Sequence, residues 1–168
     1  MRSERRPHIV VMGVAGCGKT TVARRVAELI DAEFLDADDL HPPSNIEKMA
    51  AGIPLTEADR EPWLAAVAAR LTGRDRRYVV ACSALRRRHR DVLRSGAEPV
   101  VFAHLTGPPE IIRARLAQRS GHFMSPGMLD SQLALLEPLE PDEPGTVLDI
   151  AAPPDAIART AADFSNER

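Results

Sequence analysis

The chain has 168 residues, a net charge of −2 and a pI near 6.2, and a length in this range predicts one domain with a sizeable core. The near balance of 22 basic and 24 acidic residues excludes a globally basic nucleic-acid-binding protein, and the 44% hydrophobic content excludes a largely disordered chain. Every apolar run is shorter than the ~18 residues of a membrane span, so no membrane partner is expected.

Apolar and turn patterns predict strands that alternate with helices along the chain. Short apolar runs predict strands at residues 8–13, 33–38, 78–83, 99–105 and 146–150. Helical spacing and turn signals predict helices at residues 19–31, 44–51, 62–71, 86–94, 108–119, 126–137 and 153–164. Ser44 is expected to cap the second helix, and Pro62 is expected in the first turn of the third. The order predicts a three-layer α/β fold, in which a five-stranded parallel sheet carries helices on both faces.

The N-terminal stretch and the cysteines bear on the compartment. The N-terminal stretch is basic and then apolar, but the apolar part is short and leads into a glycine-rich loop, so it is not expected to be a signal peptide. Two cysteines, Cys17 and Cys82, are too few for a disulfide framework. A reducing cytoplasm is the expected location.

A glycine-rich loop with the pattern G-x-x-x-x-G-K-[ST] joins the first predicted strand to the first predicted helix. Its residues, with the one that follows, are Gly13, Val14, Ala15, Gly16, Cys17, Gly18, Lys19, Thr20 and Thr21. The glycines let successive backbone N–H groups point at phosphate oxygens, and the helix N-terminus adds partial positive charge. Lys19 is expected to bridge the β- and γ-phosphates of ATP, and the Thr20 hydroxyl to ligate Mg²⁺. The motif stands between a predicted strand and a predicted helix, as a phosphate-binding loop does, which argues against a glycine-rich turn that binds nothing.

GTPases share this loop, but their base-reading Asn-Lys-x-Asp motif is absent, because the chain has lysine only at Lys19 and Lys48. A D-x-x-G pattern at residues 142–145 follows no predicted strand and carries little weight. A small-molecule or nucleotide kinase, or an ATPase, remains.

Carboxylates follow the second predicted strand, at Asp36, Asp38 and Asp39. In an open parallel sheet, ligands bind beyond the carboxyl ends of the strands, which puts Asp36 and Asp38 beside the γ-phosphate site. Their spacing on an extended chain directs both toward one face. One carboxylate can hold Mg²⁺ through water, and the other can accept a proton from an attacking hydroxyl. The alternative is a solvated acidic turn, which is the preferred interpretation of Asp39.

A basic run, Arg86-Arg87-Arg88-His89-Arg90, follows the third predicted strand. Arg86 stands at the carboxyl end of that strand, where it can meet an anionic substrate. Most of the run is expected to be a solvated helix face. One short basic run without interleaved aromatic residues disfavours nucleic-acid binding.

Arginines also precede a loop that is expected to close over the substrates. A kinase must exclude water from ATP, and an arginine on such a loop also neutralises transition-state charge. Arg119 is the candidate for that role. Arg115, one helical turn earlier, is the candidate for stacking on adenine, and Pro153, after the last strand, for packing against the base. The alternatives are exposed arginines and, for Pro153, a simple helix start.

Three stretches resemble the gluconokinase family. They are DADDLHPPSNIEKMAAGIPLTEADREPWL at 36–64, CSALRRRHRDVLR at 82–94 and RSGHFMSPGMLDSQLALLEPLE at 119–140, and with GVAGCGKT the resemblance covers about residues 9–150. HPPSNIEKM and PLTEADREPW are specific to that family, whereas the phosphate loop alone is not. The small residues Ala15 and Cys17 depart from the polar ones frequent in relatives, and neither side chain needs to touch phosphate.

The resemblance implies a fold like that of nucleoside-monophosphate and shikimate kinases, and transfer of the ATP γ-phosphate to the 6-hydroxyl of D-gluconate. It implies one P-loop kinase domain over residues 1–168, with a substrate-binding segment at about 39–72 and a lid at about 119–128. It also implies Mg²⁺ and a homodimer. By position, Asp36 would support Mg²⁺, and Asp38 would orient or deprotonate the acceptor hydroxyl. The residues implied to hold gluconate are His41, Lys48, Arg60, Arg86 and Gln132, with Arg60 favoured as the carboxylate clamp.

Two other functions stay open at this point. A kinase for another small hydroxy acid, such as shikimate, is disfavoured because Cys82-Ser83-Ala84 stands where shikimate kinases typically have three glycines. A non-catalytic ATP-binding sensor is disfavoured by the intact set of Lys19, Thr20, the acid pair and Arg119. Trp63 and Phe34 are expected in the core rather than at a ligand.

Overall fold

The computed structural model describes residues 5–73, 75–96, 98–119 and 126–168. All five strands are parallel and follow the order β2-β3-β1-β4-β5, so the predicted three-layer α/β fold is confirmed. The strands are β1 His8–Met12, β2 Glu33–Asp36, β3 Tyr78–Ala81, β4 Val100–Thr106 and β5 Gly145–Asp149. The helices are α1 Lys19–Ile30, the 3₁₀ helix η1 Ala37–Leu40, α2 Pro43–Ala50, α3 Glu57–Arg70, α4 Arg87–Leu93, α5 Pro109–Ala117, α6 Pro126–Leu135 and α7 Pro154–Asn166.

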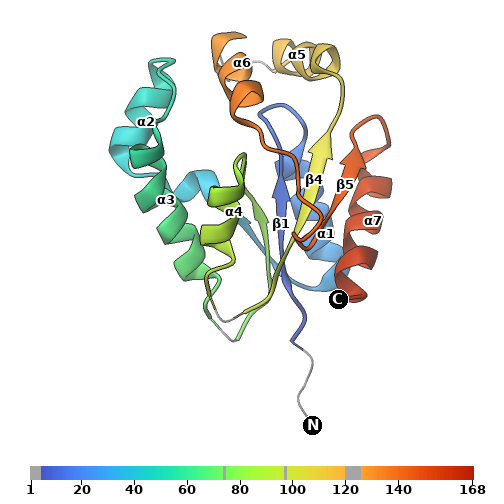
Figure 1. Cartoon of the computed structure of the whole chain (residues 1–168). Coiled ribbons are helices and arrows are strands. Elements are labelled where there is room, and N and C mark those ends of the chain that lie inside the picture. Colours follow the sequence, from blue (N-terminus) through green and yellow to red (C-terminus); the bar gives the residue numbers. More distant parts are fainter. Residues whose placement is uncertain (1–4, 74, 97, 120–125) are drawn as a thin grey trace.

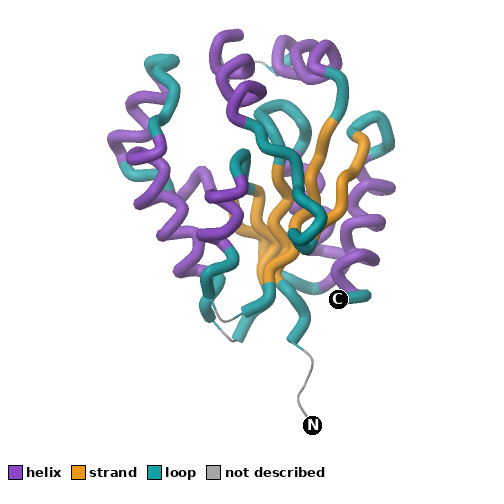
Figure 2. Tube along the Cα trace, viewed as in Figure 1, coloured by secondary structure: helices purple, strands orange, loops and turns teal. Residues whose placement is uncertain are grey.

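Helices cover both faces of the sheet (Figure 1). Alternate side chains of β1 serve the two faces: Ile9 and Val11 pack with α1 and α7, whereas Val10 and Met12 pack with α3 and α4. The central strands are buried on both sides, which explains why they read as continuous apolar runs. Figure 2 shows the strands as a central layer, with α2, α5 and α6 beyond the end at which β1 leads into α1. That end holds the carboxyl termini of the strands.

Two predicted helix starts are wrong. Helix α2 begins at Pro43, and Ser44 does not cap it, because a proline fits the first helical position, where its missing N–H costs nothing. Helix α3 begins at Glu57 rather than at Pro62, which lies inside it. The start is set by a capping box: Thr56 Oγ1 accepts from the Asp59 N–H at 3.1 Å, and Asp59 Oδ2 accepts from the Thr56 N–H at 2.9 Å.

The expectation of a mostly solvated basic run is wrong for its last two residues. His89 and Arg90 are buried, and Arg90 forms a bidentate pair with the equally buried Glu143 at 2.6 and 3.0 Å. A buried guanidinium needs such a partner. In the described ranges, no helix has the length and apolar character to cross a membrane.

Candidate active site

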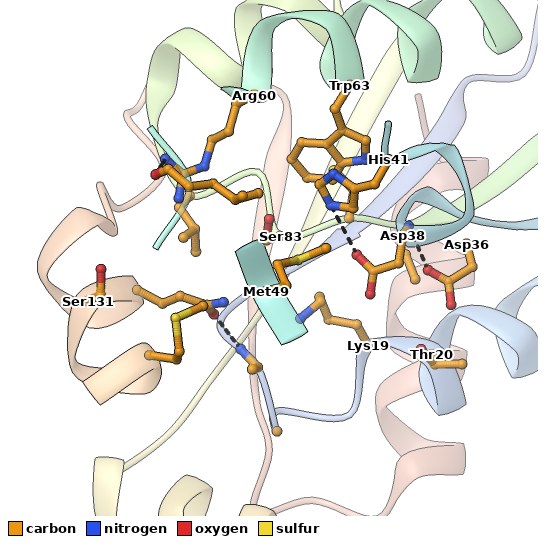
Figure 3. A pocket seen from close by; sticks show the side chains of 18 of the residues that line it. Lys19, Thr20, Asp36, Asp38, His41, Met49, Arg60, Trp63, Ser83 and Ser131 are labelled. Carbon is orange, nitrogen blue, oxygen red and sulfur yellow. Dashed lines mark hydrogen bonds and ion pairs between the residues drawn. The ribbon is translucent and has the colours of Figure 1, made fainter. Parts of the chain in front are cut away.

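A cavity of about 280 Å³ lies at the carboxyl edge of the sheet, between the glycine-rich loop, the ends of β2 and β3, and helices η1, α3, α5 and α6 (Figure 3). It brings together many of the residues singled out from the sequence: Ala15, Gly16, Gly18, Lys19, Thr20, Asp36, Asp38, His41, Arg60, Arg119 and Gln132. Other candidates stand outside its lining: Gly13, Val14, Cys17, Thr21, Lys48, Arg86, Arg115 and Pro153.

The glycine-rich loop has the backbone that the motif requires. Gly16 and Gly18 have φ of 82° and 93°, a left-handed conformation that side chains strain, and Gly18 leads directly into α1. Lys19 Nζ donates to the carbonyl oxygen of Val14 at 3.1 Å. The thiol of Cys17 is buried beside Gly13 and does not line the cavity, in keeping with a spacer role. The loop lines the cavity with Ala15, Gly16, Gly18 and Lys19.

Asp36 and Asp38 lie at the carboxyl end of β2, next to Lys19. Asp36 Oδ1 accepts from the Asp38 N–H at 3.0 Å, which caps η1 and fixes the bend between the two carboxylates. Burial raises the pKa of Asp36, and the nearby Lys19 opposes that rise. The Asp38 side chain is 80% exposed, so its carboxylate is free to meet a substrate hydroxyl.

The donors around this corner fit Mg²⁺. Among the described residues, no group of three or more His, Cys, Asp or Glu side chains could hold a metal ion by itself. Mg²⁺ is usually held by one or two protein ligands together with water and substrate phosphates. The Thr20 hydroxyl and the Asp36 carboxylate, both in the cavity lining, are a set of that kind.

An aromatic wall faces the acid pair, and the sequence did not predict it. His41 stacks on Trp63, with ring centroids 4.2 Å apart and planes 15° from parallel. Trp63 is buried in the core, as expected, but it also lines the cavity, and its Nε1–H donates to Ala37 O at 2.7 Å. The other lining residues that sequence reasoning missed are Met49, Pro54, Leu55, Ala81, Cys82, Ser83, Leu85, Leu116, Met128 and Ser131. Of these, Cys82 and Ser83 could have been predicted as lining residues, because they stand at the carboxyl end of a predicted strand.

Arg60 is a buried cation that opens onto the cavity. Its Nη1 donates to Leu55 O at 2.7 Å and lies 3.4 Å from Glu57 Oε1. Nη2 and Nε have no acceptor within the described part of the chain, so both can receive a ligand carboxylate. Lys48, by contrast, is engaged elsewhere, because its ammonium contacts Asp59 Oδ2 at 2.7 Å.

The remaining candidates flank the cavity. Arg86 Nε lies 3.8 Å from Glu57 Oε1 and is buried without a hydrogen-bond partner in the described residues. Arg115, in α5, donates from Nη2 to Ile150 O at 2.9 Å and so contacts the loop between β5 and α7, which also holds Pro153. Arg119 lies two residues after the end of α5 and is the last described residue before 120–125. Most of the predicted lid lies at 120–125, outside the described residues.

A glycine-rich loop between β1 and α1, with acids at the carboxyl end of β2, the next strand along the chain, defines a P-loop kinase. A sequence model described as an AAA domain matches residues 9–139. The thermosensitive gluconokinase of Escherichia coli is 44% identical over 137 residues, which are 80% of this chain and 73% of that protein. The Gluconobacter oxydans gluconokinase is 46% identical over 81% of this chain and 78% of its own length.

Solved structures agree with these sequence matches. A gluconokinase from Sinorhizobium meliloti superimposes with a TM-score of 0.89 at 42% identity, covering 96% of this chain and 93% of that one. The chain belongs to the gluconokinase family, which confirms the resemblance seen in its sequence.

Proposed function

We propose that this protein transfers the γ-phosphoryl group of ATP to the 6-hydroxyl of D-gluconate, giving ADP and 6-phospho-D-gluconate. One observation carries the proposal: a single cavity joins the phosphate-binding Lys19, the exposed carboxylate of Asp38 and the buried guanidinium of Arg60. These are the groups that a phosphoryl donor, a reacting hydroxyl and a substrate carboxylate need. Family membership supplies the choice of gluconate.

At the nucleotide end, the loop at 13–20 is proposed to hold the phosphates. Backbone N–H groups and Lys19 would neutralise the β- and γ-phosphates, and Thr20 and Asp36 would hold Mg²⁺. Bound Mg²⁺ supplies charge stabilisation for the transferring phosphoryl group. Arg115, in α5, and Pro153, on the loop after β5, are proposed to flank the adenine; the support is that Arg115 Nη2 donates to Ile150 O at the start of the loop that holds Pro153.

At the acceptor end, Asp38 is proposed to receive the proton of the 6-hydroxyl. The hydroxyl oxygen forms a bond to the γ-phosphorus, and the bond from that phosphorus to the β–γ bridging oxygen breaks. The hydroxyl proton passes to the Asp38 carboxylate and later to water. Arg60 holds the gluconate carboxylate at the other end of the acceptor, while His41, Lys48, Arg86 and Gln132 are the proposed polyol contacts.

The segments at about 39–72 and 119–128 are proposed as the substrate-binding and lid segments of one kinase domain. The first segment holds the end of η1 and helices α2 and α3, and its His41, Met49 and Arg60 line the cavity. Arg119, at the start of the second, is proposed to neutralise charge when the lid excludes water.

We also propose a cytoplasmic homodimer as the working form. Both cysteines are free and buried, which suits a reducing compartment. The dimer rests on the family resemblance, and light scattering after size exclusion tests it: a dimer gives twice the 18.3 kDa of the chain.

ADP release from ATP and Mg²⁺ tests the function, with D-gluconate, shikimate, nucleoside monophosphates or no acceptor in parallel. We expect turnover with gluconate alone. Lys19→Met is the control, with an expected loss of at least about 10²-fold in turnover and an unchanged circular dichroism spectrum. Turnover with a different acceptor would keep the kinase mechanism and reject gluconate. ATP binding without turnover on any acceptor would favour the sensor.

A further inference from the structure

Asn45 is the one residue of α2 that is buried, and it is polar. Its side-chain amide lies between two elements of the acceptor side of the cavity. Nδ2 is 2.9 Å from the backbone oxygen of Asp59 and 3.2 Å from Nδ1 of His41. Burying a side-chain amide costs free energy unless hydrogen bonds within the protein compensate for the lost water contacts. The two contacts of Asn45 supply that compensation.

The contact with Asp59 settles which end of the amide faces His41. A backbone carbonyl oxygen only accepts hydrogen bonds, so the Asn45 atom beside Asp59 O is the donor nitrogen, not the amide oxygen. That same nitrogen faces His41 Nδ1. Since an NH₂ group has two hydrogens and no lone pair to offer, Nδ1 of His41 is the acceptor of the second one. The proton of a neutral His41 ring is therefore on Nε2.

We propose that Asn45 is a positioning residue for phosphoryl transfer: it fixes His41 in the tautomer with the proton on Nε2, so that the ring presents an N–H group to the Asp38 carboxylate. The inference rests on the proposed function, which makes Asp38 the proton acceptor. His41 Nε2 lies 3.7 Å from Asp38 Oδ1, on the line drawn between the two side chains in Figure 3. That separation exceeds a hydrogen bond, and the proposal requires the exposed Asp38 side chain to turn toward the ring when substrate binds.

The surroundings keep the ring neutral and fixed in plane. Stacking on Trp63 sets the plane of the imidazole. Burial, reinforced by Arg60 and opposed by Asp36, lowers the pKa of His41 to about 4. A neutral imidazole has one N–H and one lone pair, so the tautomer decides whether Asp38 meets a donor or a repelling lone pair. With a donor on Oδ1, the second oxygen of Asp38 stays available for the substrate hydroxyl.

The tautomer is measured directly in the wild-type protein, without any activity assay. Two-bond ¹H–¹⁵N correlation spectra of the protein labelled with ¹⁵N-histidine at pH 7 report which ring nitrogen carries the proton, and the His41→Gln spectrum identifies the His41 signals by their loss. We expect Nε2 protonated and Nδ1 bare. A ring protonated on Nδ1, alone or together with Nε2, overturns the proposal.

Kinetics test the positioning role. In Asn45→Ala, we expect kcat with gluconate to fall about tenfold, because the carboxylate is no longer held, while KM for ATP stays within about twofold. The matched control is Asn166→Ala, at the exposed end of α7, for which neither constant should change. An unchanged kcat in Asn45→Ala contradicts the proposal. If the wild type does not phosphorylate gluconate, the proposed function fails instead, and the tautomer measurement still decides what Asn45 does to His41.

Discussion

The side-chain oxygen of Gln132, in α6, accepts a hydrogen bond from the backbone N–H of Ala15 in the phosphate loop at 2.8 Å. The two residues are 117 positions apart. A P-loop N–H is a donor for a phosphate oxygen, so the Gln132 amide occupies a position that the nucleotide is expected to claim. The contact links the helix that follows the proposed lid to the loop that is proposed to bind ATP.

Replacing Gln132 by glutamate should therefore weaken ATP binding. The carboxylate accepts from Ala15 N–H more strongly than the amide does and repels phosphate, so we expect a loss of on the order of tenfold in affinity. Gln132→Ala should change the affinity by less than about threefold, because water replaces the amide. Titration calorimetry without gluconate measures both. Gln118→Glu, outside the cavity, controls for the added charge, and equal losses in the two glutamate variants would contradict the contact's role.

Arg60 should govern the affinity for the acceptor. Arg60→Lys keeps the charge but loses the planar fork that binds a carboxylate through two hydrogen bonds, so KM for gluconate should rise about 10- to 100-fold. KM for ATP should change by less than about threefold, because Lys19 and the loop are the groups proposed to hold the nucleotide. Arg70→Lys, an exposed site on the same helix, is the matched control. A proportional rise of both KM values in Arg60→Lys would show damage to the fold rather than loss of a carboxylate clamp.

The buried pair of Arg90 and Glu143 should carry much of the local stability beside the site. Arg90 Nη1 also donates to Ala84 O at 3.0 Å and thereby holds the chain between β3 and α4, whose Ala84 has a φ of 43°. Glu143→Ala leaves an uncompensated buried charge, and we expect a loss of about 3–5 kcal/mol in the free energy of unfolding. Urea denaturation measures it. Arg25→Ala, which breaks an exposed pair with Glu28, should cost far less, because water screens an exposed ion pair. Similar costs for the two variants would refute the special weight of the buried pair.

His104 should make stability fall in mild acid. It is buried in β4, its Nε2 has no partner within the described residues, and burial, with Arg90 nearby, lowers its pKa from 6.5 to about 4. Between these two pH values the unfolded chain binds a proton that the folded chain does not, so acid favours unfolding. The contribution of neutral His104 to the free energy of unfolding is about 3 kcal/mol. It is present in full above pH 6.5 and is lost as the pH falls to 4.

The variant His104→Leu removes this titration. We expect its stability advantage over the wild type to grow steadily from pH 7 to pH 4 in urea denaturation, since the other histidines are common to both proteins. Parallel pH profiles for the two proteins would contradict the buried neutral state of His104.

Local signals in the sequence were enough to predict that Lys19, Thr20, Asp36 and Asp38 come together, and all four line the cavity. Lys19 and Thr20 belong to a contiguous motif, and Asp36 and Asp38 follow from the rule that ligands meet the carboxyl ends of parallel strands. The capping box at Thr56 was also a local signal, but the helix start was predicted from Pro62 instead. Such features depend on residues within a few positions of one another.

The acceptor end depends on pairings across the chain, which a single sequence does not display. Arg90 looked like part of a solvated run because its partner Glu143 is 53 positions away. Asn45 stands in the family-specific stretch HPPSNIEKM, but that stretch did not indicate its role, which depends on the contacts of one amide with Asp59 and His41. Trp63 was correctly assigned to the core, but the stack that also makes it a wall of the cavity was not predictable from composition or spacing.

The position of the transferred phosphoryl group tests the central claim most directly. ³¹P–¹H correlation spectra of the product formed from ATP, Mg²⁺ and D-gluconate identify the carbon whose protons couple to the new phosphate ester. We expect one product, with phosphorus coupled to the two protons of C6, and no detectable product with Lys19→Met. Phosphorus at another carbon, or inorganic phosphate in place of an ester, would contradict it.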